Sequence, residues 1–279
     1  MTTDFANGFT SKSDILAEVL KGCGKLTIAV SGGVDSMTLS CFAHRTLGRK
    51  AVQMVHALSP AVPRAATARV NVQAKHEGWR LKVVDAGEFA DERYRANPLN
   101  RCFFCKANLY QTLARLSEGA ILSGTNCDDL GDFRPGLQAA AEHHVRHPYV
   151  EAGFAKADVR VLAKHMGLEE IAELPSSPCL ASRVETGIRI ESNNLKGIDA
   201  VESWILKKLA PETVRCRVRS SGLAVELDPQ TLASLTEHQK TGLAREVRRI
   251  YGRHAALEVN LETYRQGSAF VNPAPGGTR

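Results

Sequence analysis

Short apolar runs alternate with helix-like patterns through the first half of the chain. The runs short enough to be buried strands are residues 26–30 (LTIAV), 51–57, 81–84 and 120–123. The segments with helical spacing between them are 34–47, 65–76 and 103–116. Strands that alternate with helices form parallel βαβ units. The pattern therefore predicts an α/β fold with a doubly wound parallel sheet, in which ligands lie at the carboxyl ends of the strands.

After about residue 175 the pattern changes. A predicted helix at 195–209 is followed by two alternating apolar runs, 214–218 and 223–227, with the turn sequence RSSG between them, and then by a helix at 229–251 and a strand at 256–261. This order predicts a second, smaller α+β domain. We expect a nucleotide-binding domain over 1–180, the second domain over 181–270, and a disordered tail over 271–279.

Composition narrows the class of protein only slightly. The chain has 279 residues, of which 43% are hydrophobic and 24% charged, as in ordinary soluble domains. No apolar run approaches the roughly 20 residues that span a bilayer, and the N-terminus carries no signal pattern, so we expect a cytoplasmic protein without a membrane partner. The net charge of +6 suits either nucleic acid or an anionic small molecule such as ATP.

The strongest local motif is Ser31-Gly32-Gly33-Val34-Asp35-Ser36, which joins the first predicted strand to the first predicted helix. Two glycines allow a phosphate to approach the backbone, and the helix N-terminus presents N–H groups to the anion. The two serines add hydroxyl donors, and the aspartate can cap the helix or hold Mg²⁺. The motif lacks the spacing and the lysine of a Walker loop. It therefore predicts a phosphate site of another kind.

A second segment of the same type is ILSGTNCDD at 121–129. It again places a glycine and polar side chains directly after a buried strand. Gly124, Thr125 and Asn126 are predicted to meet the nucleotide at the neighbouring strand end. Asp128 and Asp129 are candidate Mg²⁺ ligands, although each can equally be a helix cap.

Cysteine usage gives the third signal. The seven cysteines are odd in number, and a reducing compartment makes a disulfide framework improbable. Cys102 and Cys105 form a C-x-x-C at the start of a predicted helix, a position that favours thiolates. This spacing fits a redox pair, a metal clip or two packed thiols. Cys179 lies in the loop sequence SSPCLASR, close to Arg183, and is either a reactive thiol or an incidental loop cysteine.

These motifs together resemble one family. SGGVDS resembles the signature of the PP-loop ATP pyrophosphatases. The segments NPLNRCFFCK (97–106), GTNCDDLGDFRPG (124–136), 141–168, PCLASR (178–183) and LETYRQGS (261–268) resemble the LarE family of PP-loop sulfur transferases over nearly the whole chain. The resemblance implies that a carboxylate of pyridinium-3,5-biscarboxylic acid mononucleotide is adenylated by ATP and Mg²⁺ and then converted to a thiocarboxylate for the nickel-pincer nucleotide.

The resemblance also implies two possible sulfur sources. In one branch the cysteine that matches Cys179 gives up its own sulfur, and in the other the cysteines that match Cys102, Cys105 and Cys179 bind a [4Fe–4S] cluster. All three cysteines occur here, so the cluster branch is the prediction. The resemblance further implies a homo-oligomer and a substrate pocket with an anion-binding role, whose residues are Arg183, Glu202, Arg217 and Arg219.

Three other interpretations remain open at this point. A PP-loop tRNA thiolase shares the loop and the cysteines, but the extra zinc-binding cysteine pairs or tRNA-binding domain usual in that class are not apparent. An amidating ligase of the same superfamily has no need of Cys179. The third is a nucleotide- or metal-binding module without catalysis. We therefore do not expect the protein to bind nucleic acid.

Overall fold

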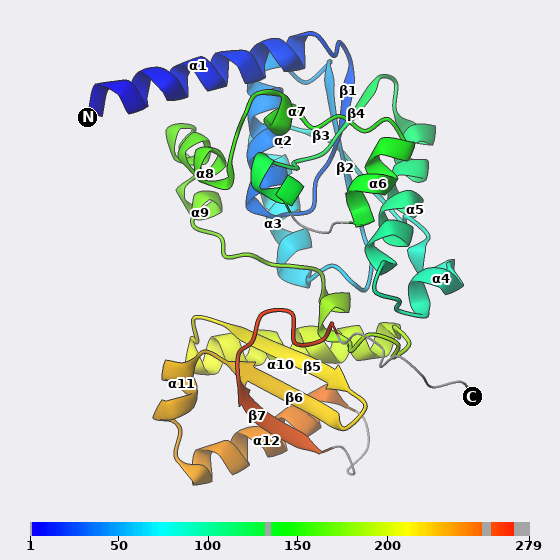
Figure 1. Cartoon of the computed structure of the whole chain (residues 1–279), viewed down its shortest axis with the longest axis vertical. Helices are drawn as coiled ribbons and strands as arrows, with labels where there is room; N and C mark the ends of the chain where they lie inside the picture. Colours follow the sequence, from blue (N-terminus) through cyan, green and yellow to red (C-terminus); the bar gives the residue numbers. More distant parts are fainter. Residues whose placement is uncertain (1, 132–134, 253–257, 271–279) are drawn as a thin grey trace. The chain divides into compact units, whose positions relative to one another are not determined.

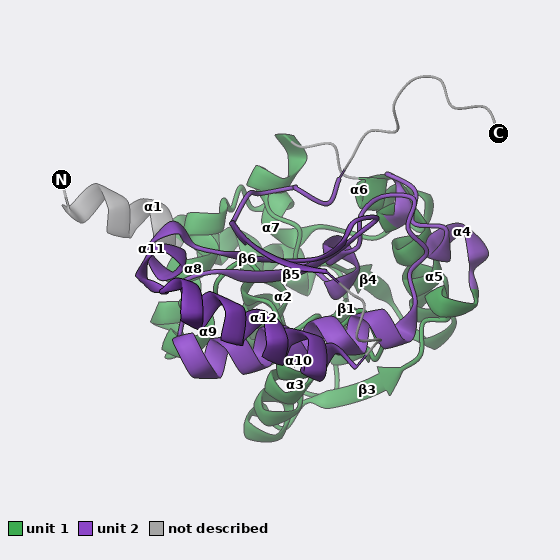
Figure 2. Cartoon of the chain, turned by 90° about the horizontal axis from the view of Figure 1, so that it is seen from below, with its two compact units in different colours: residues 1–90, 102–177 green, residues 91–101, 178–279 purple. Residues whose placement is uncertain are grey.

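The computed structural model describes residues 2–131, 135–252 and 258–270, which fall into two compact units. The first unit comprises residues 1–90 and 102–177, and the second comprises 91–101 and 178–279 (Figure 2). The predicted tail at 271–279 lies outside the described residues.

The first unit is built on a four-stranded sheet in the order β3-β2-β1-β4, and all three neighbouring pairs are parallel. Its strands are β1 (Leu26–Ala29), β2 (Val52–Ala57), β3 (Arg80–Val84) and β4 (Ala120–Leu122). The predicted α/β fold class is confirmed. The order places β1 and β4 side by side, although β2 and β3 lie between them in sequence. Ligands of such sheets bind where the order of strands reverses, which here is between β1 and β4.

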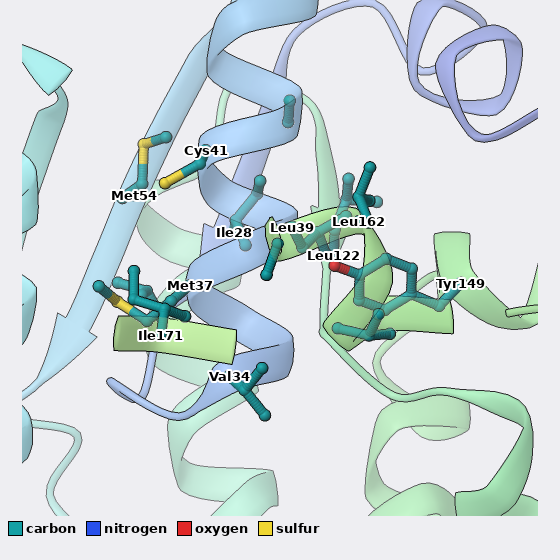
Figure 3. Close-up of a cluster of buried hydrophobic side chains, with 14 of the residues drawn as sticks. Ile28, Val34, Met37, Leu39, Cys41, Met54, Leu122, Tyr149, Leu162 and Ile171 are labelled. Atoms are coloured by element: carbon teal, nitrogen blue, oxygen red, sulfur yellow. The ribbon is translucent and has the colours of Figure 1, made fainter. Parts of the chain in front are cut away.

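Helices cover both faces of this sheet (Figure 1). Strand residues alternate between the faces, so Met54 joins one buried cluster and Val55 the other. The first cluster draws on α1 (Thr2–Lys21), α2 (Val34–Leu47), α3 (Arg64–Glu77), α7 (Pro148–Glu151), α8 (Lys156–His165) and α9 (Glu169–Ala172). Figure 3 shows part of it, including Ile28 of β1, Met37 and Leu39 of α2, and Ile171 of α9. The second cluster draws on α5 (Arg101–Leu116) and α6 (Pro135–Glu142).

The second unit contains a three-stranded sheet in the order β5-β6-β7. Strands β5 (Val214–Arg219) and β6 (Gly222–Leu227) form the predicted hairpin, and β7 (Val259–Thr263) runs parallel to β6. Helices α10 (Ser192–Leu209) and α12 (Glu237–Tyr251) pack together and against β5 and β7, respectively. Two residues of the predicted strand, 256 and 257, lie outside the described residues.

The single helix predicted over 229–251 is wrong. The structure has two helices there, α11 (Pro229–Ser234) and α12. Asp228 caps the first, because its side chain accepts a hydrogen bond from the Thr231 N–H. Thr236 starts the second with a capping box, since its side chain and that of Gln239 each accept from the other's backbone N–H.

Residues 91–101 lie between the two segments of the first unit in sequence, but they belong to the second unit. They include α4 (Glu92–Arg95), between the short 3₁₀ helix η1 (Glu88–Ala90) and α5. Asn97 fixes the segment, because its Nδ2 donates to the carbonyls of Val184, Glu185 and Ile188. Asn97 also has φ +55°, a left-handed conformation that asparagine adopts more readily than most residues.

None of the helices in the described part of the chain combines the length and the apolar character that crossing a membrane requires.

We predict that Gly197→Ala destabilises the second unit. A Cβ at Gly197 of α10 would lie 2.7 Å from Cδ2 of the Tyr251 ring, which is buried. We expect the overpacking to lower the free energy of unfolding by about 1–3 kcal/mol, measured by urea denaturation. Gly242→Ala in α12 is the matched control, because a Cβ there has no described atom within 4 Å. The control is expected to gain up to roughly 1 kcal/mol from helix propensity. Equal stability of the two variants would contradict the α10–α12 packing.

Candidate active site

The SGGVDS loop, residues 31–36, leaves β1 and enters α2. Gly32 has φ +85°, and a Cβ there would lie 2.6 Å from the Ala66 carbonyl oxygen, so no other residue fits. The hydroxyls of Ser31 and Ser36 lie 3.0 Å apart, and the Ser31 N–H donates to Ser36 Oγ at 3.0 Å. Among the described residues no side chain caps α2, whose N-cap is Gly33. The first turn of this helix therefore presents its N–H groups at the carboxyl end of β1.

The turn after β4 approaches the same helix end. A Cβ at Gly124 would lie 2.8 Å from the backbone nitrogen of Ser36, so the glycine permits the contact. Thr125 Oγ1 lies 3.0 Å from Ser123 Oγ, which in turn lies 2.8 Å from Nδ1 of His147. Burial lowers the pKa of His147. This part of the site is therefore held by neutral hydrogen bonds.

Asp35 connects the two segments through its carboxylate. Its Oδ1 accepts from Asn126 Nδ2 at 3.2 Å, and its Oδ2 accepts from Lys156 Nζ at 2.5 Å. The Lys156 backbone N–H donates to Asp128, and the Asn126 backbone N–H donates to Asp129. The structure thus brings the predicted ATP-binding residues and the predicted Mg²⁺ ligands to one place in the first unit.

Two basic residues of this place were not singled out from the sequence. Lys156 is the first residue of α8 and forms an ion pair with Asp35, and its side chain is about one-third exposed. Arg69 of α3 donates from Nε to the Gly32 carbonyl at 2.8 Å, and burial lowers its pKa. Neither stands near the loop in sequence, so only the fold reveals them.

The C-x-x-C pair lies in the first turn of α5. Cys102 is exposed and Cys105 is half-buried. Residues three apart on a helix share a face, so both thiols lie on one side of α5. Cys127 is half-buried, and its backbone N–H donates to the Phe154 carbonyl.

Buried thiols elsewhere are unsuited to chemistry. Burial raises the pKa of Cys41 to about 12, and it raises the pKa of the fully buried Cys216 as well.

Cys179 belongs to the second unit, where it is exposed and precedes the 3₁₀ helix η3 (Leu180–Arg183). Arg183 holds its loop, because Nη1 donates to the carbonyls of Pro178 and Cys179. The Nε and Nη2 of Arg183 donate to the two carboxylate oxygens of Glu202, each at 3.0 Å. Glu202 also accepts from the Cys216 backbone N–H of β5 at 2.8 Å. The Arg183–Glu202 pair therefore fixes the backbone beside the Cys179 thiol to the edge of the second sheet.

Arg217 and Arg219 lie two residues apart on β5 and therefore share one face of its sheet. Both donate to Glu226 of β6, and Arg219 also donates to Glu262 of β7. Arg217 donates further to the Ser182 carbonyl at 3.0 Å, which links this face to the loop of Cys179. All four predicted substrate residues thus meet in one network, but each arginine already has a carboxylate partner.

Within the described residues, no group of three or more His, Cys, Asp or Glu side chains is arranged to hold a metal ion. Cys102 and Cys105 lie in the first unit, and Cys179 lies in the second.

Comparison with known proteins gives three relatives, while no protein-family model matches the chain. An uncharacterized protein of Synechocystis sp. is 32% identical over 261 residues, which are 92% of this chain and 96% of the relative. The pyridinium-3,5-bisthiocarboxylic acid mononucleotide synthase of Lactiplantibacillus plantarum is 29% identical over 78% of this chain and 79% of the relative. An uncharacterized protein of Methanocaldococcus jannaschii is 25% identical over 77% of this chain and 82% of the relative.

The Lactiplantibacillus relative is a synthase by name, and that name agrees with the resemblance to the LarE family. The Synechocystis match extends over almost the whole of both proteins. By that match, this chain belongs to the same protein family as the Synechocystis relative.

Proposed function

We propose that the protein is an ATP-dependent sulfur transferase. It would activate a carboxylate of pyridinium-3,5-biscarboxylic acid mononucleotide as an acyl adenylate and then replace one oxygen with sulfur. The observation that carries the proposal is the uncapped N-terminus of α2 behind Gly32 and Gly33, faced by Gly124 and Asn126. The named synthase among the relatives supports this acceptor over tRNA or ammonia chemistry.

In the first step the acceptor carboxylate attacks the α-phosphorus of ATP, and pyrophosphate leaves. The N–H groups of the α2 first turn, with the hydroxyls of Ser31 and Ser36, suit the charge of the leaving group. Gly124, Thr125 and Asn126 would contact the nucleotide from the β4 side. Lys156, whose Nζ lies 2.5 Å from Oδ2 of Asp35, adds a positive charge to the same place.

Magnesium would enter this place together with the phosphates of ATP. Its ligands on the protein would be Asp35 with Asp128 and Asp129, whose carboxylate oxygens suit a hard cation. When bound, the ion would neutralise charge on the phosphate oxygens. Lys156 forms an ion pair with Asp35 at this place.

In the second step a thiolate sulfur attacks the activated carbonyl carbon, and AMP leaves. If Cys179 is the donor, its Cβ–S bond then breaks as its Cα loses a proton. The sulfur stays with the product as a thiocarboxylate, and the residue becomes dehydroalanine. The exposed thiol of Cys179 and the fixed backbone beside it suit a group that must reach a substrate.

A [4Fe–4S] cluster is the second possible source of sulfur. Its ligands would be Cys102, Cys105 and Cys179, and the two thiols on one face of α5, one exposed and one half-buried, fit thiolate ligation. When bound by three thiolates, the cluster would supply an iron that carries exchangeable sulfide.

The four predicted substrate residues divide by their contacts. Arg183 and Glu202 are paired in the interior and position the loop of Cys179. Arg219, whose side chain on the sheet face is 22% exposed, remains the candidate for contact with an anionic acceptor, while Arg217 on the same face is buried beside Glu226.

We predict that Gly124→Ala weakens ATP binding. The added Cβ would press on the backbone nitrogen of Ser36 and displace the N–H groups that hold phosphate. Isothermal titration should show a loss of affinity of roughly tenfold or more. Gly131→Ala is the matched control, because a Cβ there meets no atom of the described residues within 4 Å. If Gly124→Ala binds ATP as tightly as the control does, the phosphates do not lie at α2.

We further predict that Cys102→Ala, Cys105→Ala and Cys179→Ala each lose iron and acid-labile sulfide after anaerobic purification. Each variant should also stop thiocarboxylate formation, while pyrophosphate release continues because adenylation needs no thiol. Cys127→Ala is the control and should keep its iron. A cluster that survives Cys179→Ala would refute ligation by three cysteines and leave Cys179 as the donor of its own sulfur.

A further inference from the structure

Arg101 is the largest fully buried side chain in the described part of the chain, with 1% exposure. It ends the segment 91–101 of the second unit and precedes Cys102 in sequence. Its Nε and Nη1 are buried, and neither has a hydrogen-bond partner. No described carboxylate forms an ion pair with it either.

The other buried arginines of this unit differ from Arg101. Arg183 pairs with Glu202 and Arg217 pairs with Glu226, each through N–O distances of 3.0 Å. A buried charge without such a partner is among the most unfavourable arrangements in a protein. Lysine or histidine can escape it by losing a proton, but a guanidinium cannot. Arg101 therefore lacks the anion that its surroundings require.

An aromatic ring holds the guanidinium in place. The Cζ of Arg101 lies 4.6 Å from the centroid of the Phe270 ring. This contact supplies no hydrogen-bond acceptor, so Nε and Nη1 stay without a partner. Phe270 is 45% exposed, so a surface side chain covers the buried charge.

We propose that Arg101 is the centre of an oxyanion site that takes a phosphate or carboxylate group. Planar N–H donors match the oxygens of both groups. That the anion belongs to the acceptor nucleotide rests on the proposed function, because the acceptor carries both groups. The site itself does not depend on that function.

The test compares Arg101→Met with wild type by thermal unfolding, without ATP or acceptor. Arg93→Met is the matched control, since Arg93 lies in the same segment with a 69% exposed side chain paired to Asp91. In sodium chloride alone, Arg101→Met should melt at the wild-type temperature or higher, because it removes an unpaired buried charge. Inorganic phosphate and pyridine-3,5-dicarboxylate are then added separately at constant ionic strength.

At least one of these anions should raise the melting temperature of wild type and of the control more than that of Arg101→Met. The apparent affinity of the variant should be weaker by roughly tenfold or more. A response to phosphate alone, or to the dicarboxylate alone, would show which of the two groups the site binds. Equal responses of variant and control, no response to either anion, or a lower melting temperature of Arg101→Met in chloride would overturn the proposal. Because no ATP is present, these outcomes are independent of whether adenylation occurs.

Discussion

The uncapped first turn of α2 lies at the carboxyl end of β1, directly beside the turn that follows β4. Two glycines make this arrangement possible, because a Cβ at Gly32 would meet the Ala66 carbonyl and one at Gly124 would meet the Ser36 nitrogen. The carboxylate of Asp35, between Asn126 and Lys156, connects the two turns. Donors fixed in this way need no rearrangement when a phosphate arrives, which is the condition for stabilising a leaving pyrophosphate.

In the second unit, buried ion pairs hold the loop of Cys179. Buried ion pairs contribute little net stability, but removal of one partner is costly, so they strongly favour one geometry over others. Arg183 and Glu202 use this property to fix the backbone of Cys179 beside β5. Arg217 extends the network to the sheet face through the Ser182 carbonyl. The thiol itself stays exposed, as a sulfur donor or a cluster ligand requires.

The alternation of strands and helices between residues 26 and 122 was predictable, because short apolar runs and flanking glycines are local signals. Helix α1 was not predicted; over residues 11–21, the part of this helix whose burial the structure describes, only Leu16 and Leu20 are buried. The break at Leu235 and Thr236 was missed because capping competes with a continuous helical pattern. The pairing of Lys156 with Asp35 and that of Arg219 with Glu262 depend on contacts between residues far apart in sequence. Such contacts leave no periodic or compositional trace in a single sequence.

Transfer of oxygen from the acceptor to AMP tests the central claim most directly. If the acceptor carboxylate attacks the α-phosphorus, a carboxylate labelled with a heavy oxygen isotope gives one labelled oxygen to the AMP that sulfur later displaces. Mass spectrometry of AMP after reaction with ATP, sulfide and labelled pyridinium-3,5-biscarboxylic acid mononucleotide should therefore find the label in AMP in proportion to thiocarboxylate formed. Thiocarboxylate formed with unlabelled AMP, or with ADP in its place, would contradict activation by adenylation.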